Sequence, residues 1–278
     1  MILPIANRFV AGETDDGAVD RAKELDSQGV GAILNLLGEH YTKPEPAKED
    51  AEVYLELAER IADANIKACI SVKPSQVGLD VGEDLFAKNM HQIGETANES
   101  GTFLWIDMED HTTTDATLDV YEELTTQYDG GVGVCVQANL KRTEEDIERL
   151  ADLPGKVRLV KGAYDEPAEI AYQKKERVNE AYRDLMRYMF EEFEDGVAIG
   201  SHDPEVISLA QDLHDTHGTG FEVQMLMGVR EDAQFDLADE HEVWQYVPYG
   251  DKWMSYFYRR LMERKENALF ALRAIAGR

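Results

Sequence analysis

The sequence predicts an α/β fold, a closed (βα)8 barrel in which eight parallel strands alternate with helices. Eight short aliphatic runs recur along the chain, and longer polar segments with helical periodicity separate them. Within each run the apolar residues are nearly continuous, as is typical of parallel strands buried on both faces. Because eight such units follow one another within roughly 250 residues, a closed barrel is favoured over an open sheet.

The eight expected strands follow one another at regular spacing. In chain order they are residues 31–37, 66–72, 102–107, 133–137, 157–162, 197–201, 221–226 and 243–247. Residues 12–28 precede the first strand, and we expect them to form an extra helix that covers the bottom of the barrel.

Local signals mark the start of several helices between these strands. Pro44-Glu-Pro46 precedes a helical pattern that continues to Ile61. Thr143 is followed by Glu-Glu-Asp, a pattern that resembles a capping box. Asp203 precedes Pro204, and proline is favoured in the first turn of a helix.

An open Rossmann-type sheet is the main alternative fold. It would need a Gly-x-Gly-x-x-Gly turn after an early strand. Gly29 and Gly31 instead begin a strand, and no third glycine follows at that spacing. Since no linker, low-complexity segment or internal repeat divides the chain, residues 1–278 are expected to form a single barrel domain.

The composition is strongly acidic. Asp and Glu total 56 against 28 Lys and Arg, which gives a net charge of -28. Such a surface repels nucleic acid and anionic membranes, so electrostatic binding to either is disfavoured. The acidic residues are spread along the chain rather than gathered in a tail, which favours a halophilic protein adapted to high intracellular salt.

Several features indicate a cytoplasmic protein. The two cysteines, Cys69 and Cys135, lie in strand-like apolar runs and are expected to be buried free thiols. No apolar run approaches the ~18 residues that a membrane helix needs. The N-terminus lacks a basic leader and an apolar core of signal-peptide length.

The carboxyl ends of the expected strands carry polar or ionisable side chains. In a barrel these ends converge on one face, where enzymes of this fold place their active sites. The residues at these ends are Lys73, Asp107, Gln137, Lys161, His202, Gln224 and Tyr246. Such a regular pattern favours a functional site over a set of solvated strand ends.

Basic residues are scarce, yet several map to this same face. They are Lys73, Arg158, Lys161, Arg259 and Arg260. The last two are adjacent, and paired guanidinium groups suit a carboxylate or a phosphate. The pattern predicts a positive cup for an anionic ligand within a negatively charged protein.

Three sequence blocks strongly resemble the proline dehydrogenase family. They are Arg158-Leu-Val-Lys-Gly-Ala-Tyr164, Tyr246-Val-Pro and Tyr256-x-x-Arg259-Arg260-x-x-Glu263. Further matches include Ser71-Val-Lys73, Ile106-Asp107, Val136-Gln137, Ser201-His202 and Phe221 to Leu226, and all follow the family's order between about residues 66 and 267. The resemblance implies an FAD-dependent (βα)8 barrel whose last helix lies over the active site.

The resemblance also implies roles for substrate-binding residues. Arg259 and Arg260, together with Lys73, would hold the carboxylate of L-proline, and Glu263 would support this basic cluster. Apolar walls around the proline ring would come from Ala163, Tyr164, Leu226, Tyr246 and Tyr256.

The remaining implied residues concern FAD. Arg158 would donate a hydrogen bond to the reactive edge of the flavin, and Asp107 would lie near the flavin and Lys73, so these two are the implied catalytic residues. The other residues implied to bind the cofactor are Met108, Gln137, Val160, Lys161, Gly162, Ala163, Ser201 and His202. No metal is expected.

The sequence therefore predicts oxidation of L-proline to 1-pyrroline-5-carboxylate, the first step of proline catabolism to glutamate. Hydride would pass to FAD and electrons then to a quinone-type acceptor, which would bring the protein into peripheral contact with a membrane. Three alternatives stay open: oxidation of 4-hydroxyproline, a Schiff-base lyase or aldolase that uses Lys73 or Lys161, and a non-catalytic acidic binding module.

Overall fold

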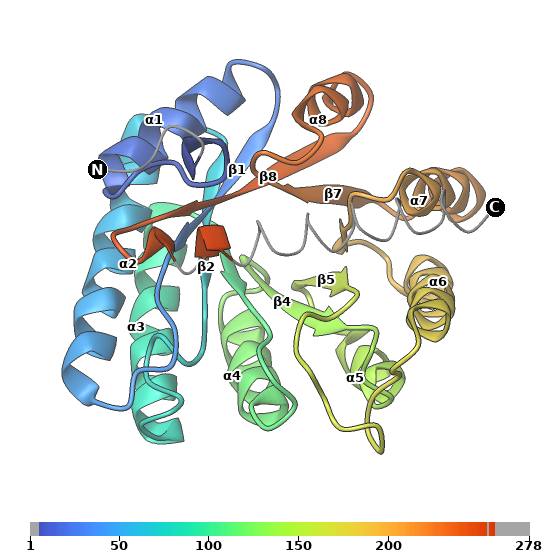
Figure 1. The fold of residues 1–278 in the computed structure, drawn as a ribbon, viewed down its shortest axis with the longest axis horizontal. Coiled ribbons are helices and arrows are strands. Elements are labelled where there is room, and N and C mark those ends of the chain that lie inside the picture. The colour runs from blue at the N-terminus through green and yellow to red at the C-terminus, as the bar shows by residue number, and fades with distance from the viewer. Residues whose placement is uncertain (1–5, 255, 259–278) are drawn as a thin grey trace.

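The protein is a closed barrel of eight parallel strands surrounded by helices (Figure 1). The computed structural model describes residues 6–254 and 256–258. Each strand pairs with the next along the chain, and the eighth pairs with the first. The strands are β1 (Gly31–Leu36), β2 (Ala68–Val72), β3 (Leu104–Ile106), β4 (Val132–Gln137), β5 (Lys156–Val160), β6 (Val197–Gly200), β7 (Phe221–Leu226) and β8 (Glu242–Tyr249).

The helices alternate with these strands. They are the short 3-10 helix η1 (Ala6–Arg8) and the α-helices α1 (Asp15–Asp26), α2 (Pro44–Ala64), α3 (Glu83–Ser100), α4 (Thr114–Gln127), α5 (Thr143–Leu150), α6 (Lys175–Glu192), α7 (Pro204–His217) and α8 (Glu231–Ala238). The fold predicted from the sequence is confirmed, and the expected strands differ from the observed ones by no more than two residues at either end.

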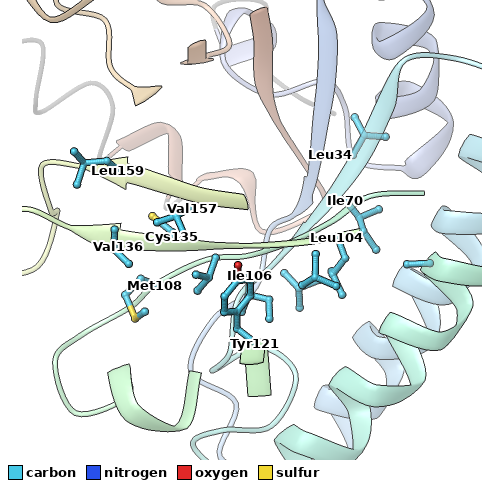
Figure 2. Close-up of a cluster of buried hydrophobic side chains, with 14 of the residues drawn as sticks. Leu34, Ile70, Leu104, Ile106, Met108, Tyr121, Cys135, Val136, Val157 and Leu159 are labelled. Carbon is cyan, nitrogen blue, oxygen red and sulfur yellow. The ribbon is translucent and has the colours of Figure 1, made fainter. Parts of the chain in front are cut away.

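The main hydrophobic core lies between the outer face of the barrel and the helices. Alternate residues of each strand point outward into it, because side chains alternate along a strand. Leu34, Ile70 and Leu104 come from three strands and are fully buried against helix residues such as Tyr121, and Figure 2 shows part of this cluster. This layer fixes the helices to the barrel wall.

The interior of the barrel is filled by the other alternate residues. Trp105 and Trp244 occupy much of its lower part. A Cβ atom on Gly133 would lie 2.5 Å from the Trp105 ring, and one on Gly31 would lie 2.4 Å from the Trp244 ring. These two glycines therefore leave the space into which the indole rings pack.

Helix α1 lies on the outer wall of the barrel and not under it, so the prediction that this segment covers the bottom is wrong. Arg21 of α1 donates hydrogen bonds to Gln245 of β8 and to Glu231 at the start of α8. On the other side, Arg60 of α2 pairs with Asp15 of α1. Helix α1 thus stands between α8 and α2, the position that the helix after the eighth strand takes in a regular barrel.

Both helices predicted to start after β4 and β6 do so, α5 at Thr143 and α7 at Pro204, but only one of them has the predicted cap. Asp203 caps α7 as expected, because its carboxylate accepts a hydrogen bond from the backbone N–H of Glu205 and Pro204 follows it. The capping box predicted at Thr143 is absent, since this residue already belongs to α5. Its hydroxyl instead donates to the carbonyl oxygen of Gln137, which ties the helix to the end of β4.

The chain leaves β8 on the face formed by the carboxyl ends of the strands. There Trp253 and Tyr256 pack with Phe9 and with Leu37, which directly follows β1. The prediction that the last helix lies over the active site concerns residues 259–278, which lie outside the described residues. Within the described part of the chain, none of the helices is long and apolar enough to cross a membrane. Both cysteines are buried and free, as predicted.

Candidate active site

A cavity of about 330 Å³ opens at the carboxyl ends of the strands. Its lining comes from residues that end strands β2 to β8 or directly follow them, which is where this fold places its functional side chains. The lining residues are Lys73, Asp107, Met108, Glu109, Cys135, Gln137, Arg158, Val160, Lys161, Gly162, Ala163, Tyr164, Gly200, His202, Gln224, Met225, Leu226 and Tyr246.

Asp107 is the centre of a hydrogen-bond network in this cavity. It follows β3, and one carboxylate oxygen accepts hydrogen bonds from the Ser71 hydroxyl at 2.8 Å and from the guanidinium of Arg158. Its other oxygen accepts a hydrogen bond of 2.6 Å from the hydroxyl of Tyr246. These three donors fix the carboxylate and, in turn, the tyrosine ring.

Arg158 lies in the floor of the cavity and is only 4% exposed. Besides Asp107, it donates to the side-chain oxygen of Gln224 at 2.9 Å. Its guanidinium also lies over the Trp105 ring, 4.9 Å from the ring centroid. Burial disfavours the charged form of Arg158, but the neighbouring negative charge of Asp107 opposes this effect, and the net pKa of Arg158 is above the ordinary value of arginine.

Two further cations, Lys73 and Lys161, stand at the sides of the cavity. Lys161 forms an ion pair of 3.5 Å with Asp203. Lys73 is close enough to Glu109 for its charge to lower the pKa of that carboxyl. Because Asp107 and Glu109 also line the cavity, the positive cup expected from the sequence is balanced by carboxylates among its described residues.

Glu109 is a buried carboxyl group beside the cavity. It accepts hydrogen bonds from the backbone N–H of Ser75 at 2.6 Å and from the Ser75 hydroxyl at 2.7 Å. Burial raises the pKa of Glu109, and these bonds and Lys73 oppose the rise. The backbone carbonyl of Glu109 accepts a bond of 2.7 Å from the Gln137 amide, so this residue holds together the loops after β2, β3 and β4.

His202 connects the loops after β6 and β7. The backbone N–H of Leu226 donates to its Nε2 at 3.2 Å, which requires that ring nitrogen to be unprotonated. The carbonyl oxygen of His202 accepts a hydrogen bond from Arg230. The imidazole is therefore held in one orientation at the edge of the cavity.

Most of the residues singled out in the sequence meet in this cavity. These are Lys73, Asp107, Met108, Gln137, Arg158, Val160, Lys161, Gly162, Ala163, Tyr164, His202, Leu226 and Tyr246. Ser201 is not among the lining residues, and its hydroxyl accepts a hydrogen bond from the backbone N–H of Asp203. Tyr256 packs at the edge of this face with Trp253, also away from the lining. Arg259, Arg260 and Glu263 lie outside the described residues.

The sequence reasoning assigned no role to several lining residues. They are Glu109, Cys135, Gly200, Gln224 and Met225. Gln224 stood out only as the polar end of a strand, although its position opposite Arg158 makes it part of the network. Gly200 and Glu109 could have been predicted from their positions in the sequence, since each lies within two residues of an implied site residue.

A (βα)8 barrel with ionisable groups converging on the carboxyl ends of its strands defines a class of barrel enzymes. A family model described as proline dehydrogenase matches residues 18–273, so the chain belongs to the proline dehydrogenase family. Proline dehydrogenase activity, the first step of proline catabolism, follows from this membership. The lyase and binding-module alternatives are thereby removed.

Curated relatives agree along nearly the whole chain. A proline dehydrogenase of Deinococcus radiodurans is 38% identical over 98% of this chain and 90% of its own length. Proline dehydrogenase 2 of Bacillus subtilis is 35% identical over 97% of this chain and 90% of its own.

Solved structures show the same fold. Proline utilization A from Bdellovibrio bacteriovorus, inactivated by N-propargylglycine, matches with a TM-score of 0.86 and 24% identity over 93% of this chain. Proline utilization A of Bradyrhizobium japonicum matches with a TM-score of 0.74 and 19% identity over 92% of this chain. This chain spans about a third of each of those proteins, 32% and 30% respectively.

The cavity fits a flavin. Gly162 has a φ of +101°, and a Cβ atom there would lie 2.1 Å from the side-chain oxygen of Asn139. That oxygen is buried beside the lining residue Gly162 and has no hydrogen-bond partner among the described residues. Met108 and Val160 add apolar surface against which a planar ring can pack. Arg158 adds a cation beside this surface, where the redox-active edge of the ring would gain negative charge.

Proposed function

We propose that the chain, acting as a single barrel domain over residues 1–278, oxidises L-proline to 1-pyrroline-5-carboxylate with FAD as its cofactor. The observation that carries this proposal is the buried network of Arg158, Asp107 and Tyr246 at the end of the cavity where the strands converge. When bound, FAD accepts the hydride taken from the proline ring. Electrons then pass to a quinone-type acceptor, which a cytoplasmic enzyme reaches by peripheral contact with a membrane.

The chain's own residues bind and orient both molecules. Lys73 attracts the substrate carboxylate, and we assign the same role to Arg259 and Arg260 on the strength of the family resemblance. Glu263 supports this clamp. Tyr164, Leu226, Tyr246 and Ala163 line the cavity and exclude water from the proline ring. We assign Tyr256 to the same wall on the strength of the family resemblance alone, since it packs with Trp253 at the edge of this face.

The cofactor is held by the other side of the cavity. Arg158 presents its cation to the redox-active edge and Asp107 fixes its orientation. The cofactor cradle consists of Met108, Gln137, Val160, Lys161, Gly162, Ala163, Ser201 and His202. Because Arg158 is buried and already paired, it needs little rearrangement when the charge of the reacting groups changes, and such preorganisation is a major source of catalysis.

An anaerobic titration tests this function. We expect the purified protein to show flavin absorbance that L-proline bleaches in a one-to-one ratio with bound flavin, and a quinone analogue should restore it. D-Proline and buffer are the controls. A protein that oxidises proline without any bound flavin, or whose flavin absorbance proline does not change, would refute the proposal.

A further inference from the structure

A row of polar side chains, buried except for the partly exposed Lys156 at its lower end, continues from the active site down into the barrel. Lys156 and Arg158 lie two residues apart on β5, and Glu222 and Gln224 lie two residues apart on β7. Side chains two apart on a strand point the same way, and these four point into the interior. Glu222 is only 3% exposed and Gln224 only 5%.

The hydrogen bonds of this row link its four side chains and Asp107 in series, with Glu222 accepting from both of its neighbours. Lys156 donates to one carboxylate oxygen of Glu222, and the other oxygen accepts from the Gln224 amide nitrogen at 2.6 Å. The amide oxygen of Gln224 then accepts from Arg158 at 2.9 Å, and Arg158 donates to Asp107.

The charges of Glu222 and Arg158 determine how the Gln224 amide is turned. A carboxylate can only accept and a guanidinium can only donate, so the amide nitrogen must face Glu222 and the oxygen must face Arg158. A flipped amide would place its donor against the guanidinium and its oxygen against the carboxylate. Gln224 therefore holds Arg158 in place only while Glu222 holds Gln224.

Stability alone does not explain this arrangement. Burial raises the pKa of Glu222, which means that its charged form is costly there despite the attraction of Lys156. A buried ion pair is commonly no more stable than well-packed apolar residues of the same volume. The same space in a barrel interior is ordinarily filled by branched apolar side chains.

We infer that Glu222 is a positioning residue for proline oxidation: through Gln224 it fixes the guanidinium of Arg158 against the redox-active end of the active site. Lys156 neutralises Glu222 and keeps it in place from below. The inference rests on the proposed function, because it takes Arg158 as the group that faces the cofactor.

Glu222→Gln tests the inference while preserving shape. The introduced amide has a single acceptor oxygen, for which Lys156 and Gln224 compete, so Gln224 loses its fixed orientation. We expect kcat to fall by about tenfold, the range found when supporting partners of active-site groups are removed. The KM for proline should change little, because the carboxylate clamp is untouched. The midpoint potential of the bound flavin should become more negative, as a displaced cation stabilises the reduced form less.

A second variant provides a rescue. In the double variant Lys156→Met with Glu222→Gln, the competing donor is gone and the introduced amide oxygen can face Gln224 again. We therefore expect kcat and the flavin potential to return toward the wild-type values, even if the melting temperature does not. A double variant as impaired as the single one would overturn the inference.

Asp146→Asn is the matched control. Asp146 is also buried, 5% exposed, and paired with an arginine, but it lies on α5 outside the barrel. It should lower the melting temperature without moving kcat or the flavin potential.

Unchanged kcat and potential in Glu222→Gln, or losses that only follow its melting temperature, would also overturn the inference. A wild-type protein whose flavin proline cannot reduce would instead refute the proposed function before any variant is compared.

Discussion

The outer and inner faces of the same eight strands are built from different chemistry. On the outer face Leu34, Ile70 and Leu104 pack against helices in a continuous apolar layer. On the inner face the barrel contains Arg158 near the active site and Glu222 below it, both deeply buried and both paired with groups of opposite charge. The barrel wall therefore separates two layers. The outer layer is stabilised by burial of apolar surface, whereas in the inner layer each buried charge needs its own partner of opposite charge.

This difference indicates how the barrel divides its tasks. Apolar contacts are non-directional, so the outer layer tolerates changes that keep volume and loses stability when volume is lost. Hydrogen bonds between charged groups are directional, so the inner network fixes positions. We expect substitutions on the outer face to change the free energy of unfolding and those on the inner face to change kinetics.

The largest expected effect is on stability, from Leu104→Ala on the outer face. Leu104 is fully buried, and removing its side chain should leave a cavity that costs about 2–5 kcal/mol. The melting temperature should fall by about 3–9 °C, measured by calorimetry, for a chain of 278 residues. The kcat of the folded fraction should stay within about twofold of wild type, as expected for a residue that makes only packing contacts. A large fall in kcat at unchanged flavin content would contradict the division between the two faces.

On the inner face, Arg158→Lys keeps the charge but removes the fork that reaches both Asp107 and Gln224. A lost charge-assisted hydrogen bond is worth about 1.5–3 kcal/mol, so kcat/KM should fall roughly 10- to 100-fold. Arg149→Lys is the control, because Arg149 also pairs with two carboxylates, Glu122 and Asp119, but on the outer helices. It should change neither kinetics nor stability by more than about 1 kcal/mol. Equal effects of the two substitutions on kcat/KM would refute the role of Arg158 in the active site.

A smaller change is expected in substrate choice at Tyr246. Burial and the neighbouring Asp107 raise the pKa of Tyr246, so the phenol stays protonated and donates to that carboxylate. Tyr246→Ser removes the ring from the cavity wall and leaves space for a ring hydroxyl. We expect the preference for L-proline over 4-hydroxyproline to narrow by about 1–2 kcal/mol, because proline efficiency falls more. The measurement is the ratio of the two kcat/KM values. An unchanged ratio with a lower melting temperature would show that the ring only packs.

The number of strands and the face of the site could be predicted from the sequence. Continuous apolar runs mark buried parallel strands, and their carboxyl ends converge in any barrel, so Asp107 and Tyr246 were expected near one another. The position of α1 could not be predicted, because an amphipathic helix before β1 can pack below the barrel or beside it. Contacts such as the hydrogen bond from Arg21 to Gln245 determine which of the two positions the helix takes.

Pairing across the barrel was also beyond the sequence. Glu222 and Lys156 are 66 positions apart, and nothing in the pattern of either strand shows that their side chains meet in the interior. For Ser201 the resemblance implies contact with the cofactor, and the sequence did not show that its hydroxyl also accepts a hydrogen bond from the backbone N–H of Asp203. A sequence pattern specifies the face of a strand, but not which partner a side chain chooses.

The smallest expected effect per residue concerns the acidic surface. The net charge of -28 should repel itself most in dilute buffer, where the screening length is about 30 Å at 0.01 M salt and about 3 Å at 1 M. We expect the melting temperature to rise with KCl and to rise most steeply below about 0.3 M, because screening saturates while preferential exclusion of salt does not. Sucrose at matched osmolality is the control for exclusion of salt from the protein surface.

The inner network is buried and little screened, so kcat at saturating proline should stay nearly constant over the same range. A melting temperature independent of KCl would remove the halophilic interpretation, and a kcat that followed the melting temperature would show that the two faces of the barrel wall are coupled.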